Sequence, residues 1–185
     1  MNMSGLGMSL AVTREKERGT LEALLSTPLR RTELLVGKLL PHLLVGLVSL
    51  VLAAMVAVFW FRVPFRGSFG LFLLLGADLL LASLALSLFI SNFIGSQGAA
   101  IIANFLLFFI PSFFLTGLLD RINTHDLGAL LRSVWLPGTH FVTISRGLFL
   151  KGVGLAALAQ PALILLGMGL TALVLGMLSF RGRLS

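Results

Sequence analysis

The chain contains no cysteine and little charge: of its 185 residues, Lys and Arg account for 14, Asp and Glu for 7, and charged residues make up 11%. Without cysteine there is no disulfide, no thiol nucleophile and no thiolate metal site. A soluble domain has about 25% charged residues, so the shortage of charge excludes an ordinary soluble domain. Residues 1–12 carry no basic residue ahead of their weakly apolar stretch, which is not typical of a secretory signal peptide.

Motifs for catalysis are also missing. The glycine-rich phosphate-binding loop would need a second upstream glycine and a hydroxyl residue around Gly37-Lys38, and neither is present. His42, His125 and His140 fall on different elements and lack the spacing of metal ligands. We therefore expect no enzyme activity, no metal site and no cofactor-binding site on this chain.

Hydrophobic residues, by contrast, make up 57% of the chain, and the mean hydropathy is +1.04. A membrane-spanning helix needs about 20 apolar residues. Four stretches meet that requirement: 39–61, 69–90, 98–119 and 155–180. Backbone polar groups are costly in lipid unless they bond internally, so these stretches must be helices. The sequence predicts an all-α, polytopic membrane helical bundle in a single domain, with the bundle over 39–180.

The basic residues predict the orientation of this bundle. An even number of spans places both termini on one side, and that side receives eight Lys and Arg residues against six on the other. Six of the eight precede the first span, which usually dominates the topology. We expect both termini to be cytoplasmic. The net charge of +7 suits anionic lipid headgroups, so nucleic acid is not needed as a partner.

Residues 120–154 are too polar to span a membrane and too apolar for a solvated loop. Pro137-Gly138 predicts a turn between two short helices. We expect a re-entrant helical hairpin before the last span, because irregular backbone at membrane depth must be covered by protein or line a cavity. An amphipathic loop lying on the membrane surface is the alternative.

The second span carries a charge, Asp78, and a stripe of small residues. A charge inside a span is costly and often functional, so Asp78 is a candidate for proton or cation coupling; a structural, hydrogen-bonded aspartate is the alternative. Small residues recur every four positions at Ser83, Ser87, Ser91 and Gly95. Such a stripe allows close helix packing, within the subunit or between two subunits.

The segment TREKERGTLEALLSTP, residues 13–28, is the most informative part of the chain. Three acidic and three basic residues lie in the segment together with Leu21, Leu24 and Leu25 at helical spacing, and Pro28 cannot continue a helix. The pattern predicts a short amphipathic helix beside the bundle. It is either a coupling element that receives a mechanical signal from a soluble partner or an anchor in the lipid interface.

This segment, followed by Gly37-Lys38 at the entry to a span, closely resembles that of type-2 ABC transporter permeases. The three spans after it, the hairpin before the last helix and the run from Arg146-Gly147 to Lys151-Gly152 fit the same family. The resemblance implies that residues 13–38 form a cytoplasmic coupling segment that docks on an ABC ATP-binding subunit. It places the contact with that subunit at Glu15, Glu17, Arg18, Gly19 and Thr20.

The resemblance has further implications for the assembly. ATP and Mg would be bound by the partner ATPase, and a second permease copy or a homologous permease would complete a dimer. The expected location is the bacterial inner membrane. Members of the family usually have a first membrane helix and an external domain ahead of the coupling segment. We therefore expect residues 1–12 to be the remnant of a membrane helix and the chain to be a partial transmembrane domain.

The sequence thus predicts the permease subunit of an ATP-driven ABC exporter, with no chemistry of its own. Two alternatives stay open at this stage. One is an ion-coupled secondary carrier that uses Asp78. The other is a membrane scaffold or assembly subunit that transports nothing.

Overall fold

The computed structural model describes residues 2–19, 31–109 and 137–181, and within these ranges every regular element is a helix. This confirms the all-α class. The elements are α1 (Asn2–Glu17), α3 (Arg31–Met55), η1 (Val56–Trp60), α4 (Phe69–Phe93), α5 (Gln97–Asn104), η2 (Phe105–Phe109), α8 (Pro137–Arg146), η3 (Gly147–Lys151) and α9 (Leu155–Arg181). The η elements are π-helical turns that continue α3, α5 and α8.

Three of the four predicted spans are confirmed as helices of sufficient length and apolarity: Val36–Trp60, Phe69–Phe93 and Leu155–Gly176. The remaining predicted span, 98–119, lies only partly within the described residues. An apolar helix runs from Gln97 to Phe109, which is the last described residue of this range. The first span extends further back than predicted, because α3 begins at Arg31 and accommodates Pro41 within the helix.

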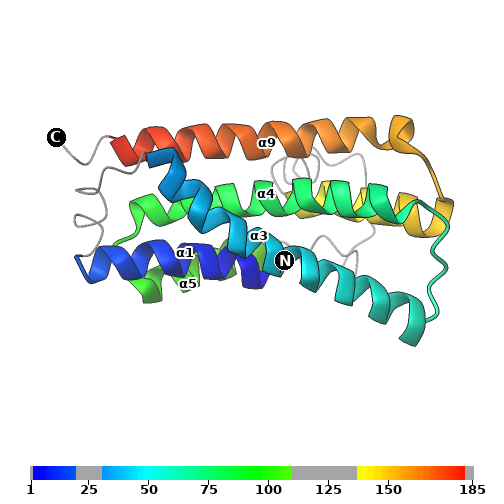
Figure 1. The fold of residues 1–185 in the computed structure, drawn as a ribbon, viewed down its shortest axis with the longest axis horizontal. Coiled ribbons are helices and arrows are strands. Elements are labelled where there is room, and N and C mark those ends of the chain that lie inside the picture. Colours follow the sequence, from blue (N-terminus) through cyan, green and yellow to red (C-terminus); the bar gives the residue numbers. More distant parts are fainter. Residues whose placement is uncertain (1, 20–30, 110–136, 182–185) are drawn as a thin grey trace.

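Helix α4 is the centre of the bundle. Figure 1 shows it between α9 and the pair α1 and α5, with α3 running obliquely across them, and it contacts each of these helices. Close packing against α9 depends on small residues, since a Cβ added to Gly169 would lie 3.2 Å from Ala82 Cα. The exposed faces of α3 and α9 carry Leu44, Val48 and Leu163, which suits contact with lipid.

Two apolar clusters lie along α4, one toward each of its ends. Buried residues of α3, α4, α8, η3 and α9 form the first, around Leu75, Leu79, Ile144 and Leu165. Residues of α1, α3 and α4 form the second: Met8, Val12, Leu39, Leu84 and Leu88. The second cluster makes α1 an integral part of the bundle.

The serines of the small-residue stripe are packed within the subunit, whereas its glycine is not. Ser83, Ser87 and Ser91 are buried, and Ser87 Oγ donates a hydrogen bond of 2.8 Å to Asn104 Oδ1 on α5. Gly5 of α1 also approaches this point, because an added Cβ there would lie 2.7 Å from Ser87 Oγ. Gly95 lies beyond the end of α4 and is exposed.

The region before the last span needs one correction. Pro137-Gly138 does not form a turn between two helices; Pro137 begins α8, where its missing N–H costs nothing because the first N–H groups of a helix have no partner within it. Helix α8 packs against α4 and α9, and Ile144 and Leu148 are fully buried. This packing favours the inserted hairpin over a loop lying on the surface. Residues 120–136 lie outside the described ranges.

Candidate coupling site

The first part of the predicted coupling segment belongs to α1. Residues 13–17 form the end of the helix that begins at Asn2, so the separate helix predicted for 13–28 does not begin there. The chain leaves α1 through Arg18 and Gly19, with Arg18 N donating to Arg14 O at 3.1 Å and Gly19 at φ 66°. A left-handed glycine is a common helix stop because it has no Cβ to clash. Residues 20–30, including Thr20, lie outside the described part of the chain.

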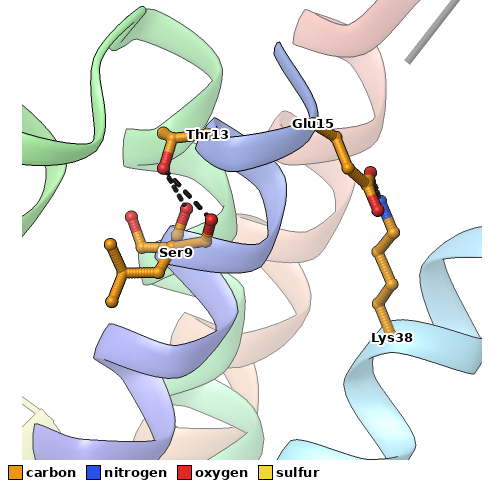
Figure 2. A network of polar contacts seen from close by, with 5 residues as sticks. Ser9, Thr13, Glu15 and Lys38 are labelled. Carbon is orange, nitrogen blue, oxygen red and sulfur yellow. Dashed lines mark hydrogen bonds and ion pairs between the residues drawn. The ribbon is translucent and has the colours of Figure 1, made fainter. Parts of the chain in front are cut away.

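The last turns of α1 present two different faces. Ser9 and Thr13 are buried, and the Thr13 hydroxyl donates to the Ser9 carbonyl at 2.8 Å, which satisfies it within the helix. Figure 2 shows this bond on one side of the helix and Glu15 extending from another side toward Lys38 of α3. Glu15 therefore leaves the helix away from its buried side and toward a neighbouring helix.

Glu15 forms an ion pair with Lys38, and both side chains are largely shielded from solvent. The pair joins α1 to the early part of α3. One turn later on α3, His42 Nδ1 lies 2.8 Å from the Lys38 carbonyl oxygen, and a carbonyl can only accept, so Nδ1 carries the proton. The same imidazole lies against Gly7, where an added Cβ would be 2.8 Å from His42 Cδ2. Helix α1 therefore contacts α3 at two places, through Gly7 against His42 and through Glu15 paired with Lys38.

Lys16 reaches the end of α4. Its Nζ donates a hydrogen bond of 2.5 Å to the carbonyl oxygen of Ser91, two residues before α4 ends at Phe93. The last four carbonyls of a helix have no partner within it and carry a partial negative charge. A lysine ammonium is therefore well matched to this position.

Glu17 reaches the start of α5. Its carboxylate accepts a hydrogen bond of 2.7 Å from the backbone N–H of Gln97, the first residue of α5, and a second from Gln97 Nε2. The backbone bond, followed by the side-chain bond, holds the pKa of Glu17 below its usual range. Ser96 caps the same helix end by accepting from Ala99 N at 3.3 Å. Glu17 thus fixes the α4–α5 connection to α1.

These contacts gather at one end of the bundle, which we call the charged end: residues 14–19, Lys38, and residues 91–97. Sequence reasoning singled out Glu15 and Glu17 but missed Lys38 and Gln97 as their partners, and it missed the bond from Lys16 to Ser91. Gly19 is the signal that could have indicated them: read as a helix stop, it places Glu15 and Glu17 in a last turn, where acidic residues are disfavoured and partners are to be expected. Arg14, Arg18 and Gly19 are exposed. Whether the predicted residues contact an ATPase stays a prediction.

Asp78 lies elsewhere, in the half of α4 nearer its start. It is half-buried, and its neighbours on the same helix face, Leu74 and Leu81, are exposed. Within the described ranges it takes part in no ion pair. Over the same residues, no group of three or more His, Cys, Asp or Glu side chains could hold a metal ion. The histidine at position 125 falls outside these ranges.

Comparison with known proteins identifies the family. Residues 1–178 match the family described as ABC-2 family transporter protein. The chain belongs to this family. It is 39% identical over 146 residues to the "Probable multidrug ABC transporter permease YbhS" of Escherichia coli (strain K12), covering 78% of this chain and 38% of the relative.

Two further relatives extend the comparison. The probable multidrug ABC transporter permease YbhR of the same organism is 30% identical over 148 residues, which are 80% of this chain and 40% of the relative. The "Inner membrane transport permease YhhJ" of E. coli is 28% identical over 180 residues, or 92% of this chain and 46% of the relative. The chain spans less than half the length of each of these relatives.

Proposed function

We propose that this ABC-2 family chain is the permease part of an ATP-driven exporter, lining the substrate path and coupled to a separate ATP-binding subunit. The observation that carries the proposal is the charged end. There the segment that resembles the family's coupling element leaves α1 with Arg14, Glu17, Arg18 and Gly19 exposed. Exposed charges at the end of an otherwise apolar bundle are available to a soluble partner.

The contact with the ATP-binding subunit is assigned to Glu15, Glu17, Arg18, Gly19 and Thr20, which follow one another along the chain. Arg18 is the best single probe among them, because it is exposed and lies in the turn after α1. Glu15 and Glu17 also hold neighbouring helices, so their substitution would disturb two things at once.

The test is co-purification of a co-expressed ABC ATP-binding subunit with the detergent-solubilised chain. We expect Arg18→Glu to reduce the retained ATPase about tenfold, since reversing a rim charge adds repulsion at an interface. Arg62→Glu, at an exposed residue after the other end of the first span, is the matched control and should retain the ATPase. Equal retention by both variants and the parent would refute docking at this turn.

The assembly follows from the same proposal. A second copy of the chain, or a homologous permease, would face this one across the substrate path, and the charged end would be cytoplasmic in a bacterial inner membrane. ATP and Mg would be bound by the partner. Binding of ATP would shift the bundle between two conformations, to the extent that the ATPase binds them with different affinity.

Ion coupling through Asp78 is the second candidate, because its carboxylate lies in a span beside exposed leucines and without an ion pair in the described ranges. Asp78→Asn keeps the hydrogen-bonding capacity and removes the charge. Under the ABC proposal, ATP-driven transport should largely persist in this variant. Complete loss of transport, with the ATPase still bound, would favour the ion-coupled carrier.

A further inference from the structure

Two acidic residues in the last turn of α1 are unexpected for an isolated helix, although Arg14 and Lys16 in the same turn have the expected sign. The C-terminal end of a helix carries a partial negative charge, so carboxylates in its last turn are destabilising. Glu15 and Glu17 both lie in the last turn of α1. Something outside α1 must favour them.

Each of the three consecutive charges matches the electrostatics of what it contacts. Lys16 meets a carbonyl at the negative end of α4, and Glu17 meets an N–H at the positive end of α5. Glu15 meets the ammonium of Lys38 on α3. Exchanging any one sign would turn an attraction into a repulsion.

The three contacts also share one geometric consequence. They fasten the last turn of α1 to three different helices, directly before the chain turns at Arg18 and Gly19 toward the rest of the coupling segment. Because Lys16 and Glu17 bind the two sides of the short α4–α5 connection, α4 and α5 are held to each other as well as to α1.

We propose that Glu15, Lys16 and Glu17 form a clamp of positioning residues, which transmits displacement of the exposed turn at Arg18 and Gly19 to α3, α4 and α5 as one unit. The inference rests on the proposed function. It differs from that function in what Glu15 does: Glu15 acts through Lys38 of its own chain, and the force from the ATPase enters at the exposed turn beyond it.

A charge exchange tests the clamp. Glu15→Lys and Lys38→Glu each place like charges together, whereas Glu15→Lys with Lys38→Glu restores an attractive pair with reversed polarity. For the purified chain in lipid nanodiscs, we expect each single variant to lower the unfolding midpoint by about 2–4 °C and the double variant to recover most of it. Arg14→Lys, at an exposed position in the same turn, is the matched control: it keeps the charge that suits a helix C-terminus and should leave the midpoint unchanged.

Reconstitution with the ATP-binding subunit gives the functional readout. Lys38→Glu, which leaves the assigned contact residues in place, should keep the ATPase bound but lower transport per ATP hydrolysed by about fivefold or more, the lower end of typical coupling between sites. Glu15→Lys should lower the same ratio. The double variant should restore the ratio. Lys16→Met should lower it as well, because the contact with the Ser91 carbonyl is lost while the length of the side chain is kept.

The outcomes separate the clamp from the docking proposal. Recovery of both stability and transport ratio in the double variant supports the clamp. Failure of the exchange to recover either quantity overturns it, and so does loss of the bound ATPase in Glu15→Lys that the exchange does not repair, because Glu15 would then be a docking contact. If the parent chain itself retains no ATPase, both the proposed function and the transmitting role of the clamp are refuted. Recovery of the unfolding midpoint in the double variant would in that case confirm only the ion pair between Glu15 and Lys38.

Discussion

Replacing Gly152 with alanine should destabilise the junction between α8 and α9, because two independent costs meet at this residue. Gly152 has φ 63°, a left-handed conformation that costs an L-residue about 1–2 kcal/mol. An added Cβ would also lie 3.0 Å from the backbone carbonyl oxygen of Arg66 and 3.0 Å from its Cβ. Overpacking of this kind typically costs about 1–3 kcal/mol.

The neighbouring backbone cannot easily yield. Arg66 N donates a hydrogen bond of 3.3 Å to Phe149 O, and an added Cβ on Gly67 would lie 2.9 Å from Leu148 O. The loop between α3 and α4 is therefore held against η3 on both sides of the contact. Adding the two costs gives about 3 kcal/mol for Gly152→Ala, or a fall of about 6–12 °C in the unfolding midpoint of a chain of this size.

Gly154→Ala is the matched control, since nothing lies within 4 Å of its added Cβ and its φ is not in the left-handed region. That change should be neutral or slightly stabilising, because alanine reduces the freedom of the unfolded chain. Gly152→Asn separates the two costs, since asparagine tolerates the left-handed region but still carries a Cβ. Thermal unfolding in nanodiscs measures all three variants. Midpoints for Gly152→Ala and Gly154→Ala within 2 °C of each other would refute the reasoning.

Three further predictions follow from the contacts of α1 and from the topology. Gly5→Leu should lower the unfolding midpoint by several degrees because its side chain would collide with Ser87; a midpoint equal to the parent's would contradict the packing of α1 on α4. Glu17 has a lowered pKa in the folded chain, so its stabilising effect is full above the usual titration range of glutamate and is lost as pH falls through the lowered pKa. The difference in unfolding midpoint between the parent and Glu17→Gln should therefore become smaller on acidification. A difference that stays constant with pH would count against the bond to Gln97. In this cysteine-free chain, Arg18→Cys and Arg62→Cys should react with a membrane-impermeant maleimide from opposite sides of the membrane, and reaction of both from one side would rule out the topology.

Much of the fold could be predicted from hydropathy. The last span was predicted at 155–180, and α9 runs from Leu155 to Arg181. The second was predicted at 69–90, and α4 runs from Phe69 to Phe93. These predictions hold because the backbone N–H and C=O groups of a long apolar stretch in lipid have to form hydrogen bonds within the stretch, which requires a helix. The ends of such a helix are set by where the apolar residues begin and end in the chain.

Helix ends governed by neighbouring elements were less predictable. The break expected at Pro137-Gly138 became the start of α8, since a proline followed by glycine suits both a turn and a first helical turn. Likewise, the charges of residues 14–17 suggested a new helix, but they end α1, whose apolar side is buried against α3 and α4. In both cases packing decided between two locally acceptable structures.

By itself, the sequence determined that this is a helical membrane protein, where its long helices lie and which segment carries the coupling charges. Only the tertiary structure decided what those charges contact. Glu15 and Lys38 are 23 residues apart, Lys16 and Ser91 are 75 apart, and Glu17 and Gln97 are 80 apart. Hydropathy is a sum over neighbours in the chain, whereas an ion pair or a helix cap depends on which helix ends meet in space, and that is fixed only when the bundle has packed.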